Sequence, residues 1–520
     1  MDYAGSIVHT CPPRDSGAYD GQVYHYEASS LTKKVMAQIP KEVISIIQTL
    51  EGAGFEAFIV GGCVRDLLIE RKPKDWDITT SAVPEDILRL FSDSKYENDF
   101  GTVCVFPPNP SDQSLAMVEV TPYRTEAQYS DKRHPDKVEF GKSLEEDLAR
   151  RDFTINSLAL NVKTDEVIDL FSGKRDFREG LIRAVGDAEE RFSEDALRIM
   201  RALRLAAELG FHIEDTTLAA IKKTAKLLRF IARERIRDEF SKIILSPAPH
   251  ETLELMRALG ILKLVAPEIE EGHGVGQNKH HIYTVWEHNL YALKYAASKA
   301  WSLEVRMAAL LHDVGKPRSK RGDGPDSSFY GHEIIGAKMT TTILNRLKYS
   351  KQFVEKASKL VRYHLFYYNV DEVGEASVRR LIRKVGPEDM EDLIKVRFCD
   401  RIGSGVPKAE PYKLRHFRFV IEKLSRDPIS VKMLKVNGSD IMKIARLEPS
   451  PKVGQLLNIL LEEVLDDPKR NTKDALQKRI KELGGMTERQ LKALADGAKK
   501  KSSALEEEEV TKIKGKHRVK

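Results

Sequence analysis

Ala57-Phe-Ile-Val-Gly-Gly-Cys-Val-Arg-Asp66 and, shortly after it, Lys74-Asp-Trp-Asp77 decide the fold of the N-terminal part of this chain. The apolar residues 57–60 predict a short strand, and Gly61-Gly62 predict a tight turn into a helix over residues 64–70. Glycines at such a turn let backbone N–H groups approach a phosphate closely, and the helix N-terminus favours its negative charge. Arg65, one turn into the helix, is expected to pair with a triphosphate oxygen.

Asp75 and Asp77 predict a magnesium site beside this turn. They are two positions apart, so on a strand their side chains project from one face. Two carboxylates beside a phosphate cradle suit a pair of Mg²⁺ ions, which activate an attacking hydroxyl and stabilise a leaving pyrophosphate. Glu119, within the predicted apolar strand 117–120, is either a third catalytic ligand or an ordinary carboxylate on an edge strand. A lone Gly-Gly or Asp-x-Asp is common in turns and loops, so the prediction depends on their combination.

A second constellation is Arg150-Arg-Asp-Phe-Thr-Ile-Asn156. Its alternation of charged and apolar residues predicts a strand or a strand end that presents Arg151 and Asp152 to a polar ligand. Ribose hydroxyls and a triphosphate both fit this pair. The alternative interpretation is a surface ion pair.

A third constellation is a helix predicted after Arg191, capped by Ser193 with acidic residues in its first turn. Charged residues recur in it every three positions and form one polar stripe: Asp195, Arg198, Arg201 and Arg204. Asp195 beside Arg198 matches the edge of cytosine or adenine, because the exocyclic amine donates to the carboxylate and the ring nitrogen accepts from the guanidinium. Uracil and guanine would turn a carbonyl toward the carboxylate and leave two acceptors unpaired. The alternative is a stripe of intrahelical ion pairs, each worth about a few tenths of a kcal/mol.

Histidines are concentrated in the second half of the chain, where seven of the fourteen lie between His273 and His364. His312 and Asp313 are adjacent within an apolar stretch that is predicted to be helical. Burying such a pair is costly unless a cation compensates it, and imidazole with carboxylate suits a divalent transition metal. Any one of these histidines alone is more often an ordinary helix residue.

The composition excludes several classes of protein. The chain has 520 residues, 41% hydrophobic and 32% charged, with a net charge of +6, which indicates several soluble domains and permits a polyanionic partner. No apolar run is long enough to span a bilayer, and no signal peptide begins the chain. The four cysteines are scattered, which predicts neither a disulfide framework nor a zinc site and favours a cytoplasmic location.

The hydrophobic patterns predict an α+β protein. Strand-like and helix-like stretches alternate up to about residue 173, so we expect a small N-terminal mixed sheet with helices. From residue 181 to about residue 483 apolar residues recur at helical spacing, which predicts a long all-α body.

Taken in order, these three constellations resemble the bacterial-type (class II) tRNA nucleotidyltransferases, the CCA-adding enzymes of the poly(A) polymerase family, over residues 43–211. The resemblance implies a polymerase-β-like head that uses CTP and ATP and acts on the 3′ end of tRNA. It assigns nucleotide binding to Gly61, Gly62 and Arg65, Mg²⁺ to Asp75 and Asp77, and ribose selection to Arg151 and Asp152. Asp195 and Arg198 would act as an amino-acid template for C and A, with Arg201 and Arg204 in the same pocket. Residues 124–140 resemble the family's flexible loop, which is associated with addition of the terminal A.

The histidine-rich half resembles the HD-domain phosphohydrolases. The resemblance implies metal ligands at His288, His312, Asp313 and Asp400, and His332 and His364 match the additional histidines of members that hold two metals. It also implies a phosphatase or 2′,3′-cyclic phosphodiesterase activity that would repair damaged tRNA ends. The identity of this metal stays open.

These resemblances complete the predicted organisation. We expect a disordered leader (1–35), a nucleotidyltransferase head (36–172), a helical neck that carries the nucleotide template and binds RNA (173–270), an HD domain (271–405), a helical domain that docks the tRNA elbow (406–488) and a charged, disordered tail (489–520).

Three functions remain open at this point. The first is CCA addition with an accessory HD hydrolase. The second is an enzyme that adds only A, either the terminal A of tRNA or a poly(A) tail. The third is a metal phosphohydrolase whose head merely binds RNA, although a pure binding module has no need of paired metal carboxylates.

Overall fold

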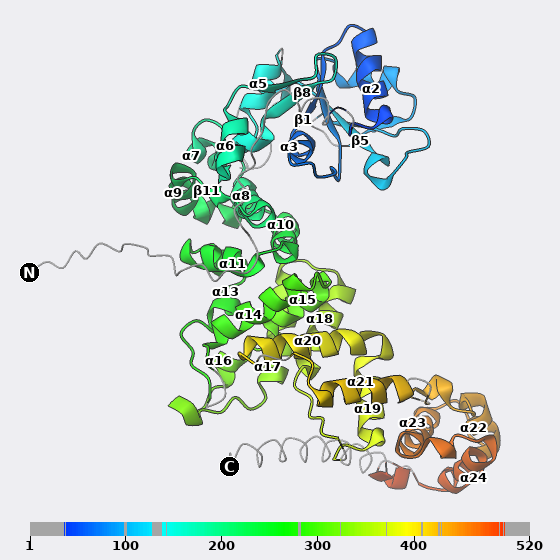
Figure 1. The fold of residues 1–520 in the computed structure, drawn as a ribbon. Helices are drawn as coiled ribbons and strands as arrows, with labels where there is room; N and C mark the ends of the chain where they lie inside the picture. The colour runs from blue at the N-terminus through cyan, green and yellow to red at the C-terminus, as the bar shows by residue number, and fades with distance from the viewer. Residues whose placement is uncertain are drawn as a thin grey trace, which may run out of the picture. The chain divides into compact units, whose positions relative to one another are not determined.

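The structure is a computed structural model and describes residues 36, 38–97, 101–126, 138–141, 143–278, 282–322, 324–370, 372–406, 409–424, 427, 429–487, 489–491 and 493–494. The chain divides into an N-terminal unit, residues 1–224, and a C-terminal unit, residues 225–520. A mixed sheet with helices occupies the first unit and helices make up the second (Figure 1), so the predicted α+β fold is confirmed. In the described part of the chain, no helix is long and apolar enough to cross a membrane.

The N-terminal unit is built on a seven-stranded sheet in the order β3-β4-β5-β2-β1-β8-β9. All neighbouring strands are antiparallel except the central pair β2 and β5. The strands of this sheet are β1 Ala57–Val60, β2 Asp77–Thr80, β3 Ser94–Tyr96, β4 Val103–Val105, β5 Val118–Pro122, β8 Leu158–Asn161 and β9 Glu166–Asp169. The helices of the unit are α2 Lys41–Gly52, α3 Gly62–Leu68, α4 Pro84–Leu90, α5 Leu144–Ala149, α6 Gly173–Glu179, α7 Ala188–Glu194, α8 Leu197–Leu209 and α9 Asp215–Thr224.

Two smaller strand pairs accompany the sheet. β6 Arg124–Glu126 pairs with β7 Val138–Phe140, and β10 Leu181–Ile182 pairs with β11 His212–Ile213. Residues 127–137, the middle of the predicted flexible loop, lie outside the described residues, as do the leader 1–35 and residues 495–520 of the predicted tail.

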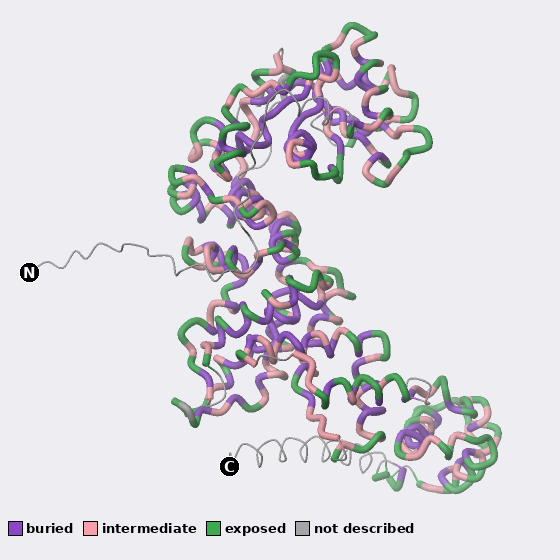
Figure 2. The backbone as a smooth tube through the Cα atoms, viewed as in Figure 1, coloured by how far each residue is buried: buried purple, intermediate pink, exposed green. Residues whose placement is uncertain are grey.

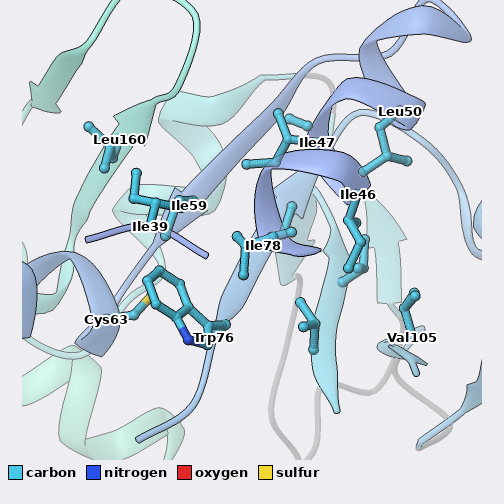
Figure 3. Packing of buried hydrophobic residues seen from close by; sticks show 14 of the residues in the cluster. Ile39, Ile46, Ile47, Leu50, Ile59, Cys63, Trp76, Ile78, Val105 and Leu160 are labelled. Atoms are coloured by element: carbon cyan, nitrogen blue, oxygen red, sulfur yellow. The ribbon is translucent and has the colours of Figure 1, made fainter. Parts of the chain in front are cut away.

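The core of the sheet follows from the alternation of side chains along β1. Ile59 packs on one face against Ile78 of β2 and the apolar side of α2 (Figure 3), while Val60 lies in a separate cluster with Leu148 and Ala159. Each aliphatic side chain that is fully buried in this way contributes roughly 1.5–3 kcal/mol. Trp76 belongs to the first cluster, so burial of the ring anchors the segment between Asp75 and Asp77.

The C-terminal unit consists of packed helices, and buried residues recur along them (Figure 2). Its helices are α10 Arg233–Leu245, α11 Pro249–Ala258, α12 Leu262–Val265, α13 Pro267–Glu270, α14 Val285–Ser298, α15 Leu303–Leu311, α16 Lys316–Ser319, α17 His332–Arg346, α18 Lys351–Tyr363, α19 Glu375–Val385, α20 Met390–Gly403, α21 Tyr412–Leu424, α22 Gly438–Ala445, α23 Pro451–Asp466 and α24 Lys473–Gly484. Helices α14 and α20 pack together, as do α17 and α18, and α15 packs against α14, α18 and α20.

Two glycines allow the closest of these approaches. A Cβ atom on Gly403 of α20 would lie 2.7 Å from the His288 carbonyl oxygen on α14. A Cβ atom on Gly315, just before α16, would lie 2.2 Å from the carbonyl oxygen of His332, the first residue of α17. Backbones therefore meet without an intervening side chain at both histidines.

Gly173 makes a similar contact in the N-terminal unit, where a Cβ atom would lie 2.2 Å from the Thr154 carbonyl oxygen. We expect Gly173→Ala to force α6 away from Thr154 and to lower the stability of the unit by roughly 1–3 kcal/mol, as overpacking does. The measurement is the thermal midpoint of the whole protein. Gly52→Ala is the matched control, because nothing lies within 4 Å of its Cβ position. Equal midpoints for the two variants would contradict the steric argument.

Candidate active site and metal centre

The glycine turn brings residues from three parts of the sequence together. Gly61 has φ +82° and precedes α3, a conformation that side chains rarely adopt. A Cβ atom there would lie 3.0 Å from Arg151 Nη1 and 3.4 Å from Asp77 Oδ2. The bare backbone of Gly61 therefore lies against an arginine of the second constellation and a carboxylate of the first.

The candidate metal carboxylates lie beside this turn on neighbouring strands. Asp77 is the first residue of β2 and pairs in parallel register with Glu119 of β5. Because partners in register project from the same face of a sheet, Glu119 belongs to the same site as Asp77. The edge-strand alternative for Glu119 is wrong, since β5 lies between β4 and β2. Asp75 also differs from expectation: it is exposed in the bend before β2 and not on the strand.

Burial and neighbouring acids raise the pKa values of Asp77 and Glu119. Burial and then the neighbouring Asp75 raise the pKa of Asp77 to about 6, against the opposing charge of Arg151. Burial, Asp77 and Glu97 raise the pKa of Glu119 to about 7. Acids that resist ionisation in this way mark a place where a cation would be stabilised. Glu97, which follows β3, belongs to no motif in the sequence and was not predicted at this site.

Arg151 is held by Asp147, an acid that was not predicted to belong to the site. Its Nη2 donates to Asp147 Oδ2 at 3.1 Å, and Arg150 Nη2 donates to the other oxygen at 2.6 Å. Thr79 of β2 also donates to Asp147 Oδ2, at 3.2 Å. Although burial acts to raise it, the two arginines hold the pKa of the fully buried Asp147 below its usual value. Asp147 therefore fixes Arg151 relative to the strand that carries Asp77.

Asp152 lies in a second network next to the first. Arg201 of α8 donates to Asp152 Oδ2 from Nε at 2.7 Å and from Nη2 at 2.6 Å. Asn156 donates to the other oxygen at 3.2 Å. Burial acts to raise the pKa of Asp152, but Arg201 and Asn156 lower it to about 2. These residues do not form the strand that was predicted: residues 150–152 make a turn, Phe153 is extended and forms an isolated bridge with Ala184, and Thr154–Asn156 form a 3-10 helix.

Arg65 is buried among protein acceptors. Its Nε and Nη2 donate to Asp66 Oδ1 at 3.0 and 2.7 Å, and its Nη1 donates to Asn156 Oδ1 at 2.8 Å. The guanidinium thus connects α3 to the Asp152 network through Asn156. Nucleotide contact by Arg65 and Gly62 stays a prediction.

The predicted template helix is broken at its most important position. α7 ends at Glu194, capped at its start by Asp187 rather than by Ser193, and Asp195 takes an extended conformation. The side chain of Asp195 then accepts from the Leu197 amide at 3.0 Å, so it caps α8 instead of sharing a helix with the arginines. The stripe is real only for the three arginines of α8: Arg198, Arg201 and Arg204.

Arg198 is buried and held in place. Its Nη1 donates to Glu194 Oε2 at 3.0 Å, and its Nη2 donates to the Arg150 carbonyl oxygen at 3.1 Å. One link therefore ties α8 to the end of α7, and another ties it to the segment that carries Arg151. Both contacts join Arg198 to residues other than Asp195, its partner in the alternative interpretation.

The six predicted ligands of the second centre converge in two groups. The first consists of His288, His312, Asp313 and Asp400, and the second of Asp313, His332 and His364, with all ligand atoms of a group within 4.8 Å of one another. The two groups share Asp313: its Oδ2 lies 3.1 Å from His288 Nε2, and its Oδ1 lies 3.2 Å from His332 Nε2. In the described part of the chain these are the groups that meet this spacing.

Local structure aims the imidazoles inward. Three of the rings bond through Nδ1 to the carbonyl oxygen three residues earlier, at 2.7–2.8 Å: His312, His332 and His364. A carbonyl oxygen only accepts, so Nδ1 carries the proton and Nε2 is left with its lone pair for a metal. The prediction that His312 and Asp313 lie inside a helix is wrong. α15 ends at Leu311, so both residues directly follow the helix.

The charge balance also fits a cation. His288 Nε2 and His312 Nε2 lie 2.8 Å apart, close to the separation of about 3 Å for two ligands at about 2.1 Å from one metal. Burial acts to lower the pKa of His312, but Asp313 and Asp400 raise it to about 9. The site therefore favours positive charge where these nitrogens meet.

Two cations outside the ligand set brace its carboxylates. Lys316 Nζ lies 2.5 Å from Asp313 Oδ2 and donates to Gln277 at 2.6 Å, and Arg397 pairs with Asp400. Burial acts against ionisation, yet Lys316 and His312 hold the pKa of Asp313 well below its usual range. Neither Gln277 nor Lys316 was predicted as part of this centre, although Lys316 follows Asp313 by one helical turn.

Comparisons with known proteins also find a nucleotidyltransferase head followed by an HD domain. A family model described as Poly A polymerase head domain matches residues 57–183, the one described as probable RNA and SrmB-binding site of polymerase A matches residues 210–272, and the HD domain model matches residues 285–403. A CCA-adding enzyme of Lactobacillus delbrueckii is 33% identical over 86% of this chain and 98% of its own length. One of Leuconostoc mesenteroides is 43% identical over 51% of this chain and 67% of its own length.

A solved structure is similar over the same extent. The Bacillus stearothermophilus CCA-adding enzyme, in complex with CTP, has a TM-score of 0.63 and 28% sequence identity, covering 85% of this chain and 96% of that one. The nucleotidyltransferase head and the HD domain imply that divalent metals are used. The predicted residue boundaries of the domains stay predictions.

The raised pKa values predict how ion binding by the head depends on pH. Asp77 and Glu119 titrate near 6 and 7, so both are largely protonated at pH 5 and must lose their protons to bind a cation. Affinity should therefore rise as the pH increases through this range. The measurement is Mn²⁺ binding by electron paramagnetic resonance from pH 5 to pH 8, in a His312→Ala background that weakens the second centre. The control Asp77→Asn/Glu119→Gln should lose this pH-dependent component, and a head affinity that stays constant across the range would contradict the assignment.

Proposed function

The chain belongs to the family of CCA-adding enzymes, and we propose that it adds C, C and then A to the 3′ end of tRNA from CTP and ATP, releasing pyrophosphate. The observation that carries this proposal is the pairing of Asp77 with Glu119 beside the bare backbone of Gly61. A relative called CCA-adding enzyme, which the match covers over 98% of its length, supports CCA addition over poly(A) synthesis.

We assign Mg²⁺ to Asp75 and Asp77, with Glu119 as a third acid at the same place. The ions would supply activation of the attacking 3′-hydroxyl and neutralisation of the leaving pyrophosphate. The chain itself contributes position and charge. Gly61 and Gly62 would admit the phosphates, Arg65 connects the turn to Asn156, and Asp147 holds Arg151 beside Gly61.

Base choice is assigned to Asp195 and Arg198, with Arg201 and Arg204 supporting them. Because Asp195 terminates α7 and caps α8, it has a fixed backbone, and Glu194 with the Arg150 carbonyl fixes the plane of Arg198. A rigid acceptor and a rigid donor reject a base whose edge leaves both unpaired. Asp152, fixed by Arg201, is assigned to the ribose.

The HD centre is assigned a phosphatase or 2′,3′-cyclic phosphodiesterase activity on RNA ends. Its ligand set is His288, His312, Asp313, His332, His364 and Asp400, which suits one or two divalent transition metals. The ions would polarise the phosphate and activate water. The chain's own residues orient the imidazoles through Nδ1 and balance the carboxylates through Lys316. A hydrolase whose head only binds RNA would have no use for the acids of the head.

The remaining partners follow from the same assignment. Residues 406–488 would contact the elbow of tRNA through Lys and Arg on phosphates. A cytoplasmic location is consistent with Cys63, Cys104 and Cys399, which are all free thiols. The alternative is an enzyme that adds only the terminal A. Such an enzyme would accept a tRNA that already ends in CC, but not one that ends before CCA or after the first C.

The first prediction for this function concerns nucleotide transfer. With tRNA transcripts that end before CCA, after C or after CC, the protein should incorporate C, C and A in order from single nucleotides. Incorporation on the CC end alone would support the A-only enzyme, and long A tails would support a poly(A) polymerase. Asp195→Ala should admit UTP or GTP more readily than it slows CTP use, whereas unchanged selectivity with a collapsed rate would make Asp195 structural.

The second prediction concerns the independence of the two centres. Asp75→Ala should reduce transfer by roughly a thousandfold or more, since it removes several kcal/mol of transition-state stabilisation, and should leave HD hydrolysis intact. His312→Ala should do the reverse. The assays are incorporation on tRNA and release of phosphate, or opening of a 2′,3′-cyclic phosphate, with Mg²⁺, Mn²⁺, Co²⁺ or Ni²⁺ added. One substitution that abolished both activities would overturn the two-centre proposal.

A further inference from the structure

α21, in the helical unit, carries a row of exposed aromatic rings. Tyr412 and Phe419 are 62% and 60% exposed, although large rings are usually buried. They lie seven residues apart and so share one face of the helix. His416 lies between them, with ring centroids 6.0 Å from Tyr412 and 6.1 Å from Phe419. Three π-faces therefore follow one another along two turns of helix.

Cations alternate with these rings along the same helix. Lys413, Arg415 and Arg418 are all exposed, and the segment Tyr412–Leu424 contains four Lys or Arg residues against the single acid Glu422. Arg418 forms ion pairs with two acids that lie outside this segment, Glu410 at 2.9 Å and Glu391 at 3.1 Å. Rings interleaved with cations are typical of surfaces that bind unpaired nucleic acid, where bases stack on the rings and phosphates meet the cations.

The row adjoins a hollow between two helices. A cavity of about 600 Å³ is lined by Met390 and Glu391 of α20 and by Arg415, Arg418 and Phe419 of α21, and Glu410 and Glu422 complete its polar lining. Figure 1 shows the two helices next to each other within this unit. One wall of the hollow therefore belongs to the helix that also carries the HD ligand Asp400.

Direct contacts connect the row to the HD ligands. Tyr368, in the loop after His364, is hydrogen-bonded through its hydroxyl to His416 Nδ1 at 2.6 Å. Phe366 stacks on Phe417 of α21 at 4.8 Å. Arg397, which pairs with Asp400, lies over the Phe366 ring at 6.0 Å. The loop 364–370 thus joins two metal ligands to the base of the aromatic row.

We propose that the exposed face of α21 binds an unpaired RNA strand, stacking its bases on Tyr412, His416 and Phe419, and delivers the 3′-terminal nucleotides to the HD centre. The proposal rests on the assigned HD activity toward RNA ends. Unpaired RNA is favoured over a protein partner because the cations alternate with the rings instead of surrounding a purely apolar patch. A second copy of this chain is the competing occupant.

The test compares the RNA affinity of variants that lack an aromatic ring at position 412 or 419 with that of a variant that keeps one. Binding of a fluorescent single-stranded RNA heptamer to the full-length protein is measured by anisotropy, against a duplex of the same sequence. Tyr412→Ala and Phe419→Ala should each weaken binding by about 5-fold or more, and Phe419→Leu should weaken it as much because stacking needs the ring. Phe419→Trp should restore it. Met433→Ala, which changes an exposed apolar residue of the same unit, should have no effect.

A crosslink and a kinetic measurement complete the test. A 4-thiouridine heptamer should crosslink within residues 412–419, and Phe419→Ala should raise the KM of HD hydrolysis with kcat little changed. Crosslinks confined to the head, or equal binding of the duplex, would overturn the proposal. So would a wild-type dimer in analytical ultracentrifugation that Phe419→Ala converts to a monomer, because α21 would then be an interface between copies. If hydrolysis is absent from the wild type but stacking-dependent binding remains, the assigned HD activity fails and the RNA surface stands.

Discussion

Asp77 and Glu119 lie opposite each other on the parallel strand pair of the seven-stranded sheet, and the electrostatic cost of burying these two acids is the constraint on which the candidate site depends. Buried like charges are unfavourable unless opposite charge is supplied. The unit supplies part of it as Arg151, which opposes the raised pKa of Asp77. The rest is left for a metal and the substrate. Asp147 also belongs to this arrangement, because it accepts a hydrogen bond from Arg151 and so holds that cation beside Gly61.

The HD centre solves the same electrostatic problem differently. There Lys316 and His312 oppose the effect of burial on Asp313, so the pKa of this carboxyl is lowered instead of raised. The ligands are all buried or nearly so, and glycines at positions 315 and 403 remove the side chains that would separate the helices. A head that exposes Asp75 can exchange its ions with each substrate, whereas a buried cluster suits ions that stay with the protein.

Much of this could be predicted from the sequence, and the failures share a cause. The strand–turn–helix at Gly61 and the HD ligand set depend on residue type and order, so both could be recognised. Glu119 could not be placed because strand order in a sheet depends on contacts between distant segments. Asp195 was predicted to lie within a helix because the three-residue spacing of charges continues across the break between α7 and α8. That break is only two residues long, and the Asp195 side chain stabilises it by accepting from the Leu197 amide. Asp147 and Gln277 act through tertiary contacts alone, and no local pattern marks such residues.

The position of Asp313 between the two ligand groups affects how metal ions would bind to the HD centre. One carboxylate faces both ligand groups, with a different oxygen toward each. An ion held by one group would withdraw electron density from the oxygen that serves the other. The two affinities would then be thermodynamically linked, and by reciprocity each ion would change the affinity for its neighbour by the same factor. Metal occupancy at such a centre would be a property of the pair, and its binding isotherm would depart from that of two independent sites.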